Sequence, residues 1–307
     1  MKTVKQIKNI PNARASDIVA GMRERGVLGA GRIARATDIL KEMFHDPKYT
    51  VILTLAGPVV PAGLRGIITD LLRRRQVDAL VSNGGNITHD IMESIGVRHL
   101  QGILQPNDVK ISKAGIARVG DIYMRIDSFQ RLERKVNLLL EKAITSLGEN
   151  VSVAQLLETF GNQLGDKDSI LSNAAYHRIP VFCPGVFDSM LGLHLWLYSQ
   201  RHKLKVEFTS DMTRMSDIIF DAKKLGVIIL GGGLPKHFAL GASTLRGGVD
   251  AAVQITMDRP EAGSASGALL EEAISWRKAK TSSHLVTVIA DFTIAFPLMI
   301  SAALAKK

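Results

Sequence analysis

Two glycine-rich segments in the last third of the chain carry the residues best suited to chemistry. The first is a loop of three glycines, 231–233, which follows the apolar run 227–230. That run has the length and composition of a buried strand. Glycines let backbone amides come close to a ligand because no Cβ stands in the way. Lys236 and His237 follow at the start of the next predicted helix, where the helix dipole favours an anion.

The second segment, residues 263–280, begins as a loop of small residues and continues into a predicted helix that carries Glu272, Trp276 and Lys278. Glu272 and Trp276 are four residues apart and share a helix face. Lys278 would not share that face, so we expect the helix to end or bend just before it, near Arg277.

Lys278 has neighbours that favour a neutral, nucleophilic amine. Arg277 and Lys280 flank it, and Trp276 stands beside it. Like charges and desolvation both favour the uncharged form of a lysine. The alternative is a solvated lysine at a helix C-terminus, which is the more ordinary role on residue type alone.

Composition bounds the class of protein. The chain has 307 residues, 46% of them hydrophobic and 22% charged, which fits one large α/β domain or two small ones. The net charge of +10 permits an acidic partner, a nucleotide or RNA, but the basic residues are scattered and read best as solvated helix faces. Aromatic residues make up only 5%, which argues against a reader of single-stranded RNA.

The remaining composition excludes several other classes. A single cysteine, Cys183, rules out an internal disulfide and fits a reducing cytoplasm. No apolar run reaches the roughly 18 residues of a membrane span, and residues 1–12 are polar and lack the apolar core of a signal peptide. Neither a metal-ligand spacing such as HExxH nor a GxSxG nucleophile elbow occurs.

Hydrophobic periodicity predicts alternating strands and helices after an extended lead over residues 1–12. We therefore expect a Rossmann-like α/β fold with a doubly wound, mostly parallel sheet and helices on both faces. We also expect a single domain, 1–307, with an N-terminal helical extension over about residues 1–48. Ligands should lie beyond the carboxyl ends of the strands. The predicted helices are 15–25, 29–44, 61–75, 87–95 with Asn86 or Thr88 as cap, 129–147, 152–164, 169–177, 190–200, 211–224 and 292–305, and the predicted strands are 50–55, 77–81, 179–184, 227–230, 250–256 and 284–290.

The motifs GGGLPKH at 231–237 and GSASGALLEEAISWRK at 263–278 resemble those of the deoxyhypusine synthase family. The similarity is nearly collinear over roughly residues 30–305. It includes LAGPVVPAGLR at 55–65, VDALVSNGG at 77–85, the pair His89-Asp90, IPVFCP at 179–184 and ADFTIAFPL at 290–298.

The resemblance implies an NAD-dependent transferase that moves the aminobutyl group of spermidine to a lysine of the hypusine-bearing translation factor. Lys278 would carry the butyl group as an imine, His237 would act as base, and Glu272, Trp276, His89 and Lys236 would bind substrate. It also implies a cytoplasmic homotetramer with no membrane, metal or direct nucleic-acid partner. The NAD-binding residues would be Gly57, Asn83, Gly84, Gly85, Asp188, Gly232, Gly233, Ser266 and Asp291.

Several positions depart from the family pattern. Gly57-Pro58 replaces a Ser/Thr-Asn pair, and Thr88 and His89 stand where other members have two glutamates. Leu193, Ala262 and Ala265 replace acids, for which Glu261 or Glu271 could substitute. A cation without paired acids is costly to bury. The alternatives are therefore a paralogue that uses another amine (a homospermidine-forming or agmatine-using enzyme) and a non-catalytic member that binds NAD or the translation factor.

Overall fold

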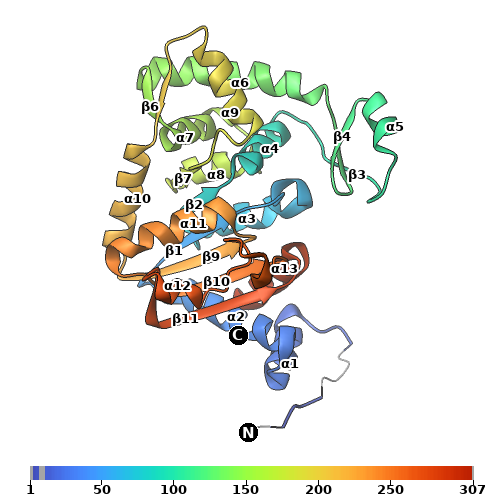
Figure 1. The fold of residues 1–307 in the computed structure, drawn as a ribbon, viewed down its shortest axis with the longest axis vertical. Coiled ribbons are helices and arrows are strands. Elements are labelled where there is room, and N and C mark those ends of the chain that lie inside the picture. The colour runs from blue at the N-terminus through green and yellow to red at the C-terminus, as the bar shows by residue number, and fades with distance from the viewer. Residues whose placement is uncertain (1–2, 7–10, 306–307) are drawn as a thin grey trace. The chain divides into compact units, whose positions relative to one another are not determined.

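The computed structural model describes residues 3–6 and 11–305, which form two compact units of chain (Figure 1). Unit 1 comprises residues 1–56, 76–81 and 212–307, and unit 2 comprises residues 57–75 and 82–211. Half of the extended lead expected over 1–12, residues 1–2 and 7–10, lies outside the described part of the chain. The single-domain organisation stays a prediction.

Unit 1 is built on a parallel sheet with the strand order β11-β10-β9-β1-β2. Nearly every residue of β9 is buried, as its apolar sequence requires. The parallel register aligns Leu55 with Leu230 and Thr256 with Ile289, so the carboxyl ends of these strands meet at one edge. The doubly wound α/β prediction is thereby confirmed. The strands are β1 (Tyr49–Leu55), β2 (Ala79–Ser82), β9 (Lys224–Leu230), β10 (Val249–Thr256) and β11 (Ala279–Ile289).

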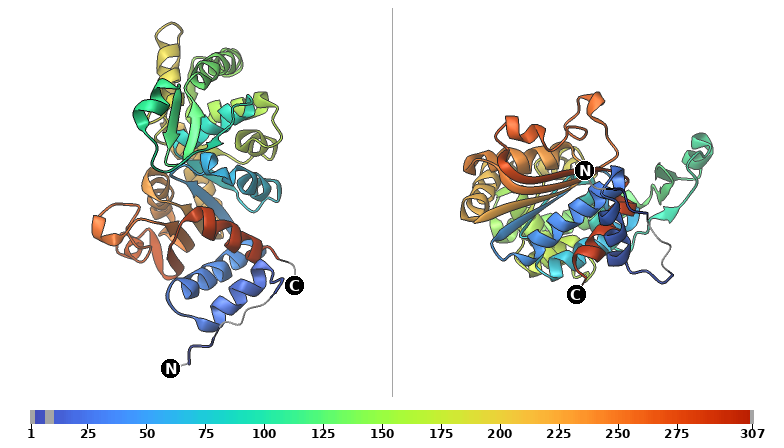
Figure 2. Two further views of the ribbon diagram at one scale, coloured as in Figure 1. Left: turned by 90° about the vertical axis from the view of Figure 1, so that its right-hand side faces the viewer. Right: turned by 90° about the horizontal axis from the view of Figure 1, so that it is seen from below.

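Helices cover both faces of this sheet (Figure 2). On one face α2 packs against β11, β10 and β1, and also against α13, while α11 and α12 lie over the other face. The N-terminal helix α1 docks on α2 and α13 through Val19, Ala34 and Ala302. The helices of unit 1 are α1 (Ala15–Arg25), α2 (Leu28–His45), α11 (Gly233–Ala242), α12 (Glu272–Ser275) and α13 (Phe292–Ala303), with short turns at Ser243–Arg246 and Pro260–Ala262 and with α10 (Thr209–Asp221) leading into β9.

Unit 2 is mainly helical, with α7 packed on α8, α3 on α8, and α4 on α9 and α6. Residues 97–127, in which no helix or strand is predicted from the sequence, form the small antiparallel sheet β3-β5-β4 with one short helix. The elements are a turn at Val60–Leu64, α3 (Arg65–Arg73), α4 (Gly84–Ser94), β3 (Leu100–Gln101), α5 (Asp108–Lys113), β4 (Ile116–Val119), β5 (Ile122–Arg125), α6 (Ser128–Leu147), β6 (Asn150–Ser152), α7 (Val153–Leu164), α8 (Ile170–Tyr176), β7 (Val181–Phe182), α9 (Met190–Ser199) and β8 (Lys205–Glu207).

Three local predictions are wrong for identifiable reasons. The helix expected over 61–75 starts only at Arg65, because Gly63 has a positive φ of 85° that breaks the helical path. The cap of α4 is Asn83, whose side chain accepts the amide of Asn86 at 3.0 Å, instead of Asn86 or Thr88. The last strand begins at Ala279 instead of His284, so the preceding helix is only four residues long.

None of the helices in the described ranges is both long enough and apolar enough to cross a membrane.

Candidate active site

A cavity of about 330 Å³ lies in unit 1 between α11 and the segment that runs from β10 to β11. It brings together five side chains singled out from the sequence: Lys236, His237, Glu272, Trp276 and Lys278. The lining is completed by apolar and small residues, namely Leu240, Gly263, Ser264, Ala265, Ala268, Leu269, Leu270 and Ala273. This volume falls in the range of about 300–1,000 Å³ that is usual for small-molecule sites.

Lys278 reaches the cavity because the chain reverses just before it. Helix α12 ends at Ser275, and Arg277 adopts a left-handed conformation with φ 56°. The amide of Lys278 then bonds the carbonyl of Ala273 at 2.8 Å, and β11 starts at the next residue. The predicted bend near Arg277 is confirmed, but Lys278 lies between helix and strand and not on the helix.

The Lys278 ammonium lies 5.5 Å from the ring centre of Trp276, within the range of a cation–π contact. Trp276 itself is 71% exposed, so its other face remains available to a ligand. A large exposed aromatic ring beside a half-buried amine is suited to an alkylammonium substrate, whose charge and methylene groups both favour such a surface.

Lys236 is strongly affected by burial. Only 5% of it is exposed, and its Nζ donates to Gln254 Oε1 at 2.9 Å and to the carbonyl of Ala268 at 2.7 Å. Desolvation lowers its pKa to about 8, Glu272 partly opposes this, and the nearby Lys278 charge adds to it. Lys236 is therefore a structural donor inside the site and does not present its charge to an anion at the helix start.

The like charge near Lys278 comes from Lys236 and not from Lys280, its neighbour in sequence. Lys280 bonds Asp250, which lies on β10 and also binds Arg246. Its charge is thereby matched, and the like charge that Lys278 meets is Lys236.

The glycine loop is locked to the small-residue loop that follows β10. A Cβ on Gly232 would lie 2.4 Å from Ser266 Cα, so no larger residue fits without movement. The amide of Gly233 donates to Ser266 Oγ at 2.8 Å. Gln254 joins the two loops, since its Nε2 donates to the carbonyls of Gly231 at 2.9 Å and Ser266 at 2.7 Å.

Gln254 was missed at the sequence level. It is completely buried in β10, and one polar residue inside the otherwise apolar run 251–255 is the signal that could have revealed it.

The other residues of this unit are more exposed. His237 is exposed on α11, and Glu272 is exposed while its carboxylate accepts the amide of Leu269 at 3.3 Å. Asp291 follows the carboxyl end of β11 and caps α13, accepting the amide of Thr293 at 2.7 Å.

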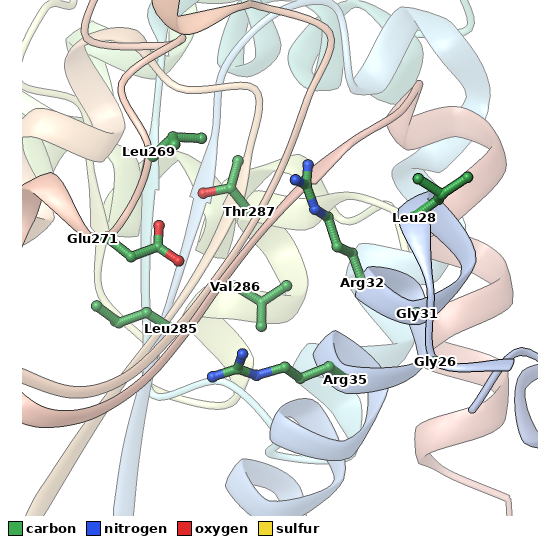
Figure 3. Close-up of a pocket in the computed structure, with 10 residues that line it drawn as sticks. All are labelled: Gly26, Leu28, Gly31, Arg32, Arg35, Leu269, Glu271, Leu285, Val286 and Thr287. Atoms are coloured by element: carbon green, nitrogen blue, oxygen red, sulfur yellow. The ribbon is translucent and has the colours of Figure 1, made fainter. Parts of the chain in front are cut away.

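Among the residues that the structure describes, Glu272 is the only carboxylate that lines the cavity of Lys278. Neither Glu261 nor Glu271, the two residues expected to substitute for missing acids, lines it. Glu271 instead lines a second cavity of about 410 Å³ in unit 1. There Arg32 and Arg35 extend from α2 towards β11 (Figure 3).

In unit 2 the structure gathers another set of predicted residues around the start of α4. The carbonyl of Gly57 accepts Asn86 Nδ2 at 3.0 Å and Asn83 Nδ2 at 3.5 Å. A Cβ on Gly84 would lie 2.3 Å from Ser189 Oγ, so this loop packs tightly on the turn after β7. At Gly85 a Cβ would find no atom nearer than 3.8 Å, which leaves that side of the loop open.

Two further predicted residues of unit 2 lie outside this loop. Asp188 is exposed in the turn after β7. His89 lies on α4, and its Nδ1 is 2.9 Å from Nε2 of His99, a residue that the sequence did not single out.

Comparison with known proteins identifies a family for this chain. The family model described as deoxyhypusine synthase matches residues 17–303. A probable deoxyhypusine synthase of Methanothermobacter thermautotrophicus is 44% identical over 291 residues, which is 95% of this chain and 94% of that protein. A second, from Methanopyrus kandleri, is 41% identical over 91% of this chain and 90% of its own length.

A solved structure supports the fold. The crystal structure of a putative deoxyhypusine synthase from Entamoeba histolytica superposes with a TM-score of 0.70 at 21% identity, covering 98% of both chains. The family match, the relatives and the fold agree over almost the whole length, and the chain belongs to the deoxyhypusine synthase family.

Proposed function

We propose that this protein is an NAD-dependent aminobutyl transferase that acts on spermidine and on a lysine of the hypusine-bearing translation factor. The observation that carries the proposal is the position of Lys278, a half-buried amine facing Trp276 in a cavity that also holds Lys236, His237 and Glu272. Membership of the family supports the general reaction, and the roles of single residues are argued from the cavity.

Lys278 forms the covalent bond to the substrate. Oxidation of spermidine removes a hydride from the butyl carbon next to its secondary nitrogen and a proton from that nitrogen, leaving a C=N bond. The Lys278 amine adds to this carbon, diaminopropane leaves, and the butyl group stays on the enzyme as an imine. The acceptor lysine then displaces Lys278 in the same way, and return of the hydride with a proton gives the secondary amine.

The neighbours of Lys278 have separate tasks. His237 is exposed on the cavity wall, where an imidazole can take up the proton that the secondary nitrogen loses. Glu272 and Trp276 provide one carboxylate and one aromatic face for the cationic end of the amine. Lys236 holds the carbonyl of Ala268 and so fixes the loop that forms the opposite wall.

NAD, when bound, would accept the hydride and later return it. The residues present fit such a group in two places. In unit 2 the N-terminus of α4, with the open side of Gly85, suits a phosphate. Asn83 and Gly84 form this N-terminus, and Asn83 donates to the carbonyl of Gly57. Asp188 directly precedes Ser189, against which Gly84 packs. In unit 1 Gly232, Gly233 and Ser266 form a close backbone approach, and Asp291 follows the carboxyl end of β11.

The test is a reaction of the purified protein with NAD and spermidine, following NADH absorbance and free diaminopropane. Borohydride should trap an aminobutyl group on Lys278, identified by mass spectrometry. Lys278→Ala should abolish both the trapped adduct and transfer to the acceptor protein. Lys280→Ala is the matched control, because that neighbouring lysine is bound to Asp250, and it should retain both. Transfer that survives in Lys278→Ala would refute the mechanism.

A second candidate is the same imine chemistry with a different amine. It is favoured by the charge of the cavity, in which two lysines face a single carboxylate, Glu272. A substrate with fewer cationic groups near that wall would bind at lower electrostatic cost. Agmatine and putrescine in the same assay decide the matter, since a signal from one of these and none from spermidine would assign a changed substrate.

A further inference from the structure

Four side chains of unit 2 form an unbroken chain of polar contacts that ends at His89. Arg65 Nη1 lies 3.5 Å from Glu93 Oε2, and Glu93 Oε1 lies 2.8 Å from His99 Nδ1. His99 Nε2 in turn lies 2.9 Å from His89 Nδ1, with the two rings 4.8 Å apart. The chain thus runs from a guanidinium through a carboxylate and two imidazoles.

Arg65, at the far end of this chain of contacts, is held in place by further ion pairs. Arg65 also binds Asp90 at 2.6 Å and Asp166 at 2.8 Å. Asp90 is fully buried and accepts the hydroxyl of Ser169 and the amides of the first turn of α8. His89 and Glu93 are four residues apart on α4 and so share a face. The geometry of the chain is therefore fixed by the fold.

The proton positions follow from the donors and acceptors available. An ionised glutamate only accepts, so His99 Nδ1 must carry a hydrogen. A neutral His99 then has a lone pair on Nε2, and His89 must donate to it through Nδ1–H. A neutral His89 has only one ring hydrogen, and its Nε2 is therefore left as a bare acceptor.

The surroundings keep His89 neutral and its Nε2 available. Burial lowers the pKa of His89 to about 4, and the Glu93 charge opposes this. His99 adds to the effect only when it is protonated, the state in which its Nε2 and not His89 Nδ1 is the donor of the pair. Within the described part of unit 2 no side chain or backbone group bonds Nε2, and the atom is not sealed inside the protein. The group is also not a metal site, because no three His, Cys, Asp or Glu side chains of the described residues are placed to hold an ion.

We propose that Glu93 and His99 are positioning residues that hold His89 in its Nδ1–H tautomer, so that Nε2 accepts a hydrogen bond from an N–H or O–H group of a bound ligand. The class of ligand rests on the proposed function, which offers an alkylammonium group of the amine and a hydroxyl of the dinucleotide. Both are donors, and both suit a neutral acceptor that is backed by the half-buried carboxylate of Glu93 two groups away.

The tautomer can be measured without any ligand or activity. Protein labelled with ¹⁵N only at its eight histidines would be studied by magic-angle-spinning NMR at pH 8, with the His89 signals assigned by their absence in His89→Asn. The expected result is a protonated Nδ1 and an unprotonated Nε2 on His89. A hydrogen on His89 Nε2 would overturn the proposal, because His99 would then be the donor of the pair.

The contacts from Glu93 through His99 to His89 form a relay that sets the His89 tautomer. Glu93→Gln tests this relay, since an amide can present either a donor or an acceptor to His99. We expect a mixture of tautomers at His89 and a five- to tenfold weaker Kd for one ligand, about the effect of one hydrogen bond. Separate titrations with NAD and with spermidine identify which ligand donates. Glu141→Gln, an exposed site on α6 in the same unit, is the matched control and should change neither.

The outcomes separate the two proposals. If neither NAD nor spermidine binds the wild-type protein while His89 shows the expected tautomer, the proposed function and the ligand assigned to His89 Nε2 both fall, and the positioning of the His89 tautomer by Glu93 and His99 stands. If both ligands bind and Glu93→Gln leaves the tautomer and both affinities unchanged, the relay is refuted and the function is untouched.

Discussion

At the scale of single residues, Lys236 should make stability depend on pH in an unusual direction. Its pKa is lowered from 10.5 to about 8 in the folded protein, so between these values the unfolded chain binds more protons than the folded one. The free energy of unfolding must therefore rise with pH across that window, by up to about 3 kcal/mol for a shift of this size. Denaturant titrations at several pH values from 7 to 10.5 measure it.

Lys236→Met provides the reference, because other groups titrate in the same window. The pKa of the buried Cys183 thiol is raised to about 12, which makes the folded state lose stability as the unfolded thiol ionises above about pH 8.5. That effect is common to both proteins and cancels in their difference. A difference that stays constant from pH 7 to 10.5 would show that Lys236 keeps an ordinary pKa.

At the scale of elements, the contact between the glycine loop and the small-residue loop predicts a large effect of one methyl group. In Gly232→Ala the new Cβ would lie 2.4 Å from the Ser266 backbone, so the two loops must separate. We expect a loss of 1–3 kcal/mol, about the usual cost of overpacking, together with a large fall in activity. Thermal unfolding and the NADH assay measure the two effects.

Gly241 is the matched site for this substitution, because it lies on the following helix, α11, with no atom within 4 Å of a new Cβ. Gly241→Ala should be neutral or stabilise by up to about 1 kcal/mol through helix propensity. Equal effects of the two alanines would contradict the tight loop packing.

The turn at Arg277 gives a second prediction at this scale. Its φ of 56° is unfavourable for a branched side chain and free of strain for glycine. Arg277→Gly should retain the fold and the borohydride adduct on Lys278, whereas Arg277→Val should lose about 1–2 kcal/mol and much of the adduct. If both variants behave alike, the left-handed turn does not place Lys278.

Hydrophobic periodicity predicted most elements of unit 1 within a few residues, because strands such as 227–230 and helices such as 15–25 are continuous apolar or amphipathic patterns. The bend at Arg277 was also predictable, from the requirement that Lys278 and Trp276 face the same site. The four-residue length of α12 was not, since pairing of Ala279 with Val249 pulls the chain into β11 early.

The electrostatics of the site could not be read from neighbours in sequence. Lys280 is adjacent to the site along the chain but binds Asp250, 30 residues away. The Nζ of Lys236 donates hydrogen bonds to Gln254 and to the carbonyl of Ala268, which lie 18 and 32 residues away in the sequence. The His99 contact with His89 likewise arises because the chain folds back after α4 ends at Ser94, a path that no local spacing reveals.

At the scale of the whole molecule, the net charge of +10 predicts opposite salt effects for the two substrates of the proposed reaction. A basic protein repels the spermidine cation at long range and attracts an acidic acceptor protein, and salt screens both effects over a Debye length of about 10 Å at 0.1 M. Raising the salt concentration should therefore lower or leave unchanged the KM for spermidine in the diaminopropane-release step.

Over the same salt range the KM for the acceptor protein should rise several-fold with little change in kcat, because steering acts mainly on association. Steady-state kinetics from 50 to 300 mM NaCl test both halves in one preparation. Equal shifts in both KM values would point to a general effect of salt on the enzyme. An acceptor KM that falls as the salt concentration rises would mean that recognition of the protein substrate does not depend on the basic surface.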